Sequence, residues 1–122
     1  MKLRHRDLFK SAPPDGTGRC TGECGDSIEM QLRLSGGRIE RAAFACDGCL
    51  STALAATAVT ELVRDAPLSK ALQLTAVHVL DRAGSLDEAH EHCAVIAVNA
   101  LHEAVSDALQ NRVASWKQLY RT

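Results

Sequence analysis

Residues 27–45 carry a pattern typical of a β-hairpin, and this pattern constrains the fold more than any other segment. Polar residues alternate with apolar ones, as in a strand with one exposed face; the apolar residues are Ile28, Met30, Leu32 and Leu34. Ser35-Gly36-Gly37 predicts a tight turn, because glycine accepts positive φ. Arg38 to Ala45 returns as a second strand whose irregular alternation leaves room for a bulge. Antiparallel pairing places both outer ends of the hairpin at one edge of the sheet.

A helical pattern begins after Cys49. Ser51 or Thr52 can cap a helix whose small and apolar residues recur every three to four positions. This helix should end near Asp65, because Pro67 disfavours helical geometry in the residue before it. Two short helices are then predicted, over Leu68–Gln73 and over Ala76–Arg82, the second closed by Gly84.

The last helix is the longest predicted element. It starts between Ala89 and Cys93, after a turn in which Ser85 and Glu88 have capping-box spacing. Its expected buried stripe is Val98, Leu101, Val105, Leu109, Val113, Trp116 and Tyr120. The segment before the hairpin is expected to hold a short helix over Leu3–Lys10, a loop over Ser11–Gly18 and a short strand over Gly18–Glu23.

Strands followed by helices indicate an α+β fold, here a small three-stranded antiparallel sheet with helices packed on one face and a long C-terminal helix. A chain of 122 residues with 46% hydrophobic content predicts one domain, residues 1–122, of which residues 1–18 form a partly flexible N-terminal segment. Only four residues are aromatic, so Leu, Val, Ile and Ala must build the core, which favours closely packed helices.

Charge and hydropathy exclude two classes of partner. The formal net charge is −1, and the basic cluster of Lys2, Arg4, Arg6 and Lys10 is too small to bind nucleic acid by neutralising phosphates. No apolar run approaches the roughly 18 to 20 residues that span a bilayer, and the N-terminus lacks the apolar segment of a secretory signal. We therefore expect a cytoplasmic protein without nucleic-acid or membrane partners.

Five cysteines form an odd set, and in a reducing compartment they favour metal ligation or catalysis over a disulfide framework. Cys24 and Cys49 flank the hairpin, and Cys93 lies with His92. Cys49 and Cys93 both lie at expected helix starts, where unpaired amides and the helix dipole are expected to lower the thiol pKa. We expect Cys24, Asp26, Cys49 and Cys93, with His92 as a possible ligand, to converge on one metal site. Thiolates with one oxygen or nitrogen suit zinc or an iron–sulfur cluster, and the harder Asp26 ligand favours release.

At these residues the chain resembles the U-type iron–sulfur cluster assembly scaffolds, the IscU proteins and the N-terminal domain of NifU. The shared motifs are Cys24-Gly25-Asp26, then Phe44 with Gly48-Cys49 before a small-residue helix, and His92-Cys93. The spacings agree as well, with 24 residues between the first two cysteines and 43 between the next two. The resemblance covers most of the chain and implies the SufE/NifU-like fold.

The resemblance implies a scaffold, not an enzyme, that builds a [2Fe–2S] cluster and hands it to apo iron–sulfur proteins. A pyridoxal-phosphate (PLP)-dependent cysteine desulfurase would supply the sulfur. Carried over residue by residue, Cys24, Cys49 and Cys93 are ligands and Cys93 is the persulfide acceptor. His92 is an auxiliary ligand, and Asp26 keeps the cluster labile. In zinc-bound members of the family, the same Cys and Asp positions hold Zn²⁺.

The sequence departs from the family at two places. The Leu-Pro-Pro-Val-Lys segment read by an Hsp70-type chaperone is replaced by Leu86-Asp87-Glu88-Ala89-His90, which argues against that partner. His90 stands where the family has lysine, and it could still donate a proton or bind metal. Cys20 and Cys46 are additional thiols, and we expect both to be structural.

Two other functions are compatible with the cysteine pattern. A zinc-binding module that accepts sulfur from a cysteine desulfurase would use the same ligands; relatives of that kind carry an insertion before the third Cys and lack the adjacent His. A thiol–disulfide oxidoreductase would use Cys46 and Cys49, which form a Cys-x-x-Cys motif between a strand and a helix.

Overall fold

The computed structural model of this chain describes residues 3–9, 13–23, 25–84 and 91–119, with side chains described for residues 8–9, 13–23, 25–84 and 91–112. The elements are β1 (Leu3–Asp7), β2 (Gly16–Thr21), β3 (Ser27–Ser35), β4 (Arg38–Gly48), α1 (Leu50–Leu62), α2 (Leu68–Leu72), α3 (Ala76–Ala83) and α4 (Glu91–Leu119). In this part of the chain the strands form one antiparallel sheet in the order β1-β4-β3-β2.

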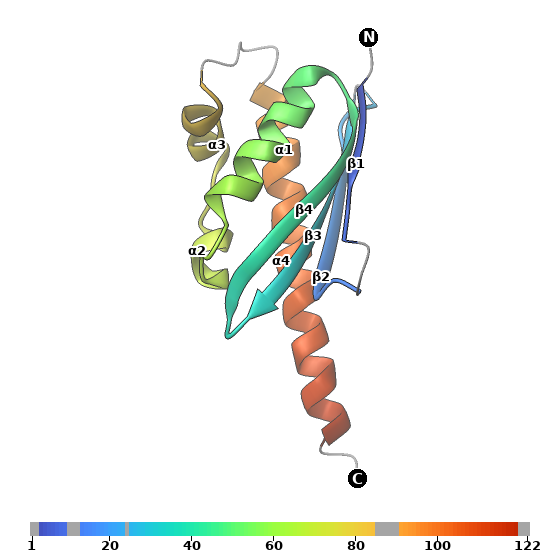
Figure 1. Cartoon of the computed structure of the whole chain (residues 1–122), viewed down its shortest axis with the longest axis vertical. Coiled ribbons are helices and arrows are strands. Elements are labelled where there is room, and N and C mark those ends of the chain that lie inside the picture. The colour runs from blue at the N-terminus through green and yellow to red at the C-terminus, as the bar shows by residue number, and fades with distance from the viewer. Residues whose placement is uncertain (1–2, 10–12, 24, 85–90, 120–122) are drawn as a thin grey trace.

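The helices lie on one face of the sheet, so the predicted α+β class and the long C-terminal helix are confirmed (Figure 1). α4 lies against β2 and β3, while α1 lies against β4. α2 and α3 pack outside α1 and α4 as a further layer (Figure 1). Among the described helices, none combines the length and the apolar character needed to cross a membrane.

The predicted hairpin is confirmed as β3 and β4. The buried positions of β3 are the predicted alternate residues Ile28, Met30 and Leu32. Gly36 and Gly37 make the turn with φ angles of 60° and 81°. The register shifts between Arg33 and Leu34, which pair with Arg41 and Ile39, so Glu40 is the extra residue of a bulge.

The expected helix over Leu3–Lys10 is wrong. Residues 3–7 form β1, which pairs antiparallel with the outer edge of β4 from Leu3↔Gly48 to Asp7↔Phe44. Pairing with a strand some 40 positions away supplies the backbone hydrogen bonds, and no local spacing of side chains reports it. The expected loop over Ser11–Gly18 also ends earlier, because β2 starts at Gly16. The sheet therefore contains the three predicted strands and a fourth.

The helix predictions differ from the structure mainly at the ends. Cys49, rather than Ser51 or Thr52, is the N-cap of α1, and the helix ends at Leu62, three residues before the predicted Asp65. α2 and α3 lie within one residue of their predicted bounds, and Gly84 closes α3 with a φ of 86°. α4 starts at Glu91, within the predicted range. The turn at Ser85 and Glu88 lies outside the described residues.

The contact between α4 and β2 is close enough to bring backbone against backbone. A Cβ atom on Gly18 would overlap the Ala100 carbonyl oxygen and the Ala104 amide nitrogen, and one on Gly16 would overlap the Ala104 carbonyl oxygen. Val98, Leu101 and Val105 of the predicted stripe are buried, but Leu109 is 39% exposed. The other three residues of the predicted stripe, Val113, Trp116 and Tyr120, lie beyond the last described side chain at residue 112. Alanines complete the buried face of α4: Ala94, Ala97, Ala100, Ala104 and Ala108.

We expect Gly18→Ala to destabilise the fold by about 1–3 kcal/mol or more, because the added methyl group forces α4 away from β2. Chemical denaturation followed by circular dichroism measures this change. Arg19→Ala is the matched control, since Arg19 is the exposed neighbour on the same strand and should change stability little. Equal stability of Gly18→Ala and the wild type would contradict the close approach.

Candidate metal centre

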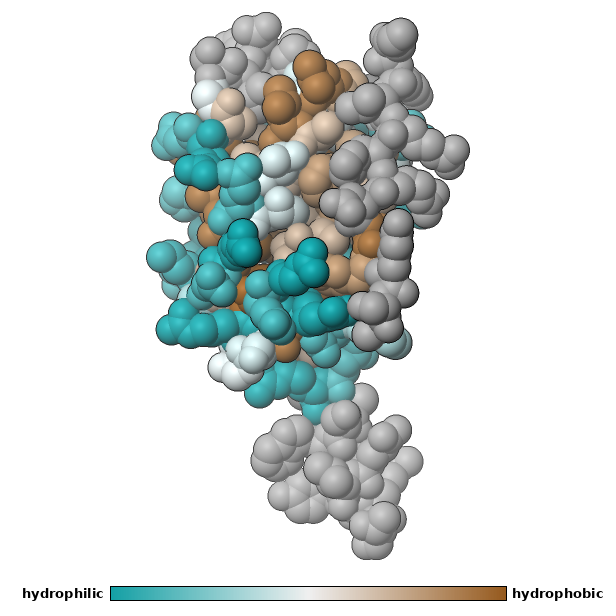
Figure 2. Space-filling model, viewed as in Figure 1, coloured by the Kyte–Doolittle hydropathy of each residue, from teal (hydrophilic) through white to brown (hydrophobic). Residues whose placement is uncertain are grey.

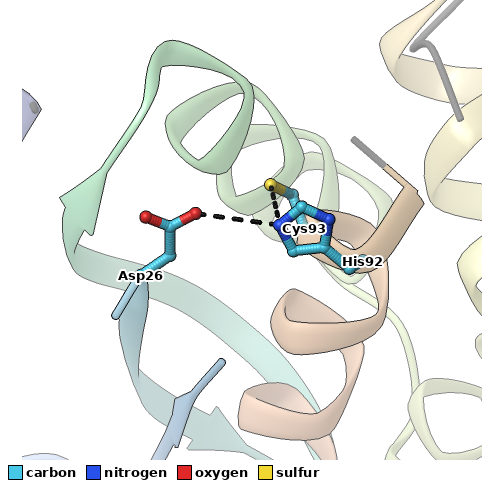
Figure 3. A group of neighbouring side chains, drawn as sticks. All are labelled: Asp26, His92 and Cys93. Atoms are coloured by element: carbon cyan, nitrogen blue, oxygen red, sulfur yellow. Dashed lines mark hydrogen bonds and ion pairs between the residues drawn. The ribbon is translucent and has the colours of Figure 1, made fainter. Parts of the chain in front are cut away.

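Three segments that are distant in sequence meet at one end of the sheet. Asp26 comes directly before β3, and Cys49 comes directly after β4. Because Ser27 pairs with Asp47, the hairpin brings these two positions to the same edge, as predicted. The first turn of α4 adds His92 and Cys93 from the other side (Figure 3).

Among the described residues, Asp26, His92 and Cys93 form a group with the spacing of metal ligands. One potential ligand atom from each lies within 4.8 Å of the other two. His92 Nε2 is 3.9 Å from Asp26 Oδ2 and 3.8 Å from Cys93 Sγ, and Figure 3 shows the three side chains directed toward a common point. Asp26 and Cys93 are buried, whereas the His92 side chain is 47% exposed. The group is therefore closed on the protein side and open to solvent at the imidazole.

Cys49 joins this group through Thr52. The Thr52 Oγ1 atom is 3.4 Å from Cys49 Sγ, 3.5 Å from Cys93 Sγ and 3.4 Å from Asp26 Oδ2. The sequence predicts Thr52 only as a possible helix cap. Its position three residues after Cys49 is the signal that could have found it, since residues i and i+3 of a helix are neighbours on one face.

Small residues leave room for the buried carboxylate. A Cβ atom on Gly48 would lie 2.7 Å from Asp26 Oδ1 and 2.9 Å from Thr52 Oγ1, so any larger residue would push these groups away. The loop before Asp26 is closed by a hydrogen bond of 2.7 Å from the Gly22 amide to the Asp26 carbonyl. Cys24 belongs to the same segment of the sequence. Cys24 and His90 both lie outside the described residues.

The two described thiols of the site differ in acidity. The pKa of Cys49 is lowered, chiefly by the hydrogen bond with the Thr52 hydroxyl and also by the Thr52 and Ser51 backbone amides at the start of α1. Burial raises the pKa of Cys93 to about 11, and the Thr52 hydroxyl offsets only part of that effect. The pKa of Cys49 is thus lowered as expected, although chiefly by a side-chain hydrogen bond. The same expectation is wrong for Cys93, because desolvation by burial dominates there.

The two additional thiols lie elsewhere. Cys46 is buried in the hydrophobic core on the same face of β4 as Phe44, and Cys20 packs against that core from β2. An oxidoreductase using Cys46 and Cys49 would need the parallel βαβ arrangement that carries such motifs. In the described part of the chain all strand pairs are antiparallel, and α1 leads to further helices rather than to a strand. The fold therefore does not support that alternative.

An apolar surface lies beside the site. Leu50 and Leu54 on the first turns of α1 are 64% and 44% exposed. Figure 2 shows hydrophobic side chains gathered at the end of the molecule where α1 begins. These leucines lie next to Cys49, the more acidic thiol.

The same motifs relate this chain to known proteins. Residues 4–114 match the family model of the NifU-like N terminal domain. The chain belongs to this family. It is 30% identical over 109 residues to the nitrogen fixation protein NifU of Nostoc sp., an alignment that covers 84% of this chain and 36% of that protein. This chain thus spans about a third of the length of its NifU relatives.

Shorter members of the family match over more of their length. The iron–sulfur cluster assembly scaffold protein IscU of Aquifex aeolicus is 29% identical over 113 residues, with 90% of this chain and 72% of that protein covered. Among solved structures, a hypothetical protein matches with a TM-score of 0.62 at 24% identity, over 75% of this chain and 81% of that one. That structural match supports the fold alone.

The difference in acidity predicts which thiol of the NifU-like site reacts first. In metal-free protein at about pH 8, we expect iodoacetamide to alkylate Cys49 about tenfold faster than Cys93, because only thiolate reacts and Cys93 stays protonated. The rate at Cys93 should climb as the pH rises toward its pKa of about 11. Peptide mass spectrometry measures each site, with half-buried Cys20 as internal control. Faster labelling of Cys93 than of Cys49 would contradict this order.

Proposed function

We propose that this chain is a scaffold for the assembly and transfer of iron–sulfur clusters, since its relative from Aquifex aeolicus is named an iron–sulfur cluster assembly scaffold protein. The observation that carries the proposal is the meeting of Asp26, His92 and Cys93 within 4.8 Å in a chain of this family. Cys24, Asp26, Cys49 and Cys93 would hold a [2Fe–2S] cluster or iron, with His92 as the possible further ligand.

The donor set suits a cluster that is cargo rather than a permanent part of the protein. Thiolate sulfur favours iron–sulfur clusters and zinc, whereas a carboxylate is a harder donor and forms a weaker bond to such a centre. Asp26 would therefore be the ligand that exchanges first. Solvent reaches the site at His92, so an incoming thiol of an acceptor protein could approach there.

We infer that the sulfur comes from a PLP-dependent cysteine desulfurase. The Cys93 thiolate would attack the outer sulfur of the desulfurase persulfide; a new S–S bond forms on Cys93, and the desulfurase cysteine leaves as thiolate. Cys93 is buried and its pKa is raised, so this step requires deprotonation by a bound metal or an opening of the site. The exposed Leu50 and Leu54 offer an apolar contact for such a partner.

A zinc-binding sulfur acceptor is the second candidate. Its support is the mixed set of one carboxylate, one imidazole and one thiol, since Zn²⁺ accepts all three in a tetrahedral site. Both candidates need the same ligands, and metal content separates them. The Hsp70-type partner has no support, because residues 86–90 lack the segment that such a chaperone reads.

Anaerobic reconstitution tests the main proposal. Protein supplied with ferrous iron, cysteine and a cysteine desulfurase should develop the visible absorption and circular dichroism of a [2Fe–2S] cluster. Cys24→Ala, Cys49→Ala and Cys93→Ala should each lose most of that signal, whereas Cys20→Ala should retain it. Stoichiometric zinc with no cluster under these conditions would favour the second candidate and exclude the first.

Removal of the exchangeable ligand should change the lifetime of the cluster. We expect Asp26→Ala to release its cluster to an apo-ferredoxin at least about tenfold more slowly than the wild type does, because the weakest bond to the cluster is gone. Asp47→Ala is the matched control, since Asp47 is an exposed carboxylate on the strand beside the site. Faster release from Asp26→Ala would show that the carboxylate retains the cluster instead.

A further inference from the structure

Thr52 lies among the proposed metal ligands, but it is not itself a proposed ligand. Within the part of the chain whose side chains are described, Asp26 and Thr52 are the buried polar or charged residues, and Thr52 has no exposed surface. Burying a hydroxyl without partners is costly, so its contacts identify its role. The Thr52 hydroxyl donates to Asp26 Oδ2 over 3.4 Å. It also lies 3.4 Å from Cys49 Sγ and 3.5 Å from Cys93 Sγ, where either atom can be the donor.

Other threonines of the same helix use their hydroxyls differently. Thr57 donates to the Ala53 carbonyl over 2.8 Å, and Thr60 donates to the Thr57 carbonyl over 2.8 Å, which is the common local pattern on a helix. The hydrogen bonds of the Thr52 hydroxyl instead go to side chains on three different segments. Capping does not explain it either, because Cys49 holds the N-cap position without a side-chain cap.

The number of protons on these groups limits what Thr52 can do. A hydroxyl donates one hydrogen bond and accepts up to two. An ionised Asp26 can only accept, and so can a cysteine sulfur once it has lost its proton to bind metal. In a loaded site three acceptors therefore surround the Thr52 hydroxyl, which has one proton to donate.

We propose that Thr52 is a positioning residue of the metal centre: its hydroxyl spaces Asp26, Cys49 and Cys93 and donates its proton to a ligand sulfur when metal is bound. The proposal rests on the metal site of the proposed function. A hydrogen bond of this kind withdraws charge from the thiolate and fixes its direction, and such supporting contacts govern both metal affinity and the electronic properties of the centre.

Gly48 leaves the space that Thr52 and Asp26 occupy. A Cβ atom there would lie 2.9 Å from the Thr52 hydroxyl and also crowd the Asp26 carboxylate. In the Gly48-Cys49 pair, Cys49 is the proposed ligand and Gly48 leaves room for the Thr52 hydroxyl that contacts it.

Cobalt(II) is the probe for the test, because sulfur-to-cobalt charge-transfer bands report thiolate ligation directly. The Thr52→Val variant keeps the shape of the side chain and removes the hydroxyl. We expect its affinity for Zn²⁺, measured by competition with Co²⁺, to fall about 10- to 100-fold. Its charge-transfer band should move to longer wavelength, because a sulfur without the hydrogen bond is more electron-rich.

Two controls separate this role from packing. Thr52→Ser restores the hydroxyl and should bind and absorb like the wild type. Thr57→Val removes an exposed hydroxyl from the same helix and should change neither quantity. Thermal unfolding of the metal-free variants checks the fold, and Thr52→Ala replaces Thr52→Val with the same expectation if the valine variant is unfolded.

The outcomes distinguish this proposal from the one on which it rests. An unchanged band and affinity in Thr52→Val, or equal losses in Thr52→Val and Thr52→Ser, would overturn the role of the hydroxyl and leave the metal site intact. If wild-type protein shows no thiolate-to-cobalt band, the metal centre itself is wrong and both proposals fail.

Discussion

The close approach of α4 to β2 is the contact on which the rest of the molecule depends. Glycine on the strand and alanine on the helix remove the side chains that would otherwise separate the helix from the sheet. α4 therefore lies flat against the same sheet face as α1 (Figure 1). Its first turn then reaches the edge where the hairpin ends, and His92 and Cys93 meet Asp26 there.

The site combines two opposite environments within a few ångströms. Cys49 lies at the start of α1, where amides and the Thr52 hydroxyl stabilise its thiolate and lower its pKa. Cys93 is also near a helix start, but burial beneath α1 and the hairpin raises its pKa. The two thiols thus differ in acidity, and Cys93 is the less acidic one. Metal binding would remove this difference, because a coordinated thiol is deprotonated outright.

Membership in the NifU-like family and the geometry of the site both support the proposed function. The family match extends over residues 4–114, so it includes every element that contributes a proposed ligand. The geometry adds what similarity does not supply: a carboxylate buried beside a thiol, an imidazole open to solvent and a threonine between them. A carboxylate in such a set favours transfer over permanent storage.

The sequence alone determined the parts of this protein that local periodicity encodes. The alternation over residues 27–34, the Gly36-Gly37 turn and the start of α4 each reflect the geometry of neighbouring residues, so the hairpin and the edge shared by Asp26 and Cys49 could be predicted. Tertiary structure alone decided that residues 3–7 pair as a strand, that Cys93 is buried, and that Thr52 lies between Asp26 and Cys93. Each of these depends on contacts between segments tens of residues apart, and the pattern of residues within a segment does not record what packs against it.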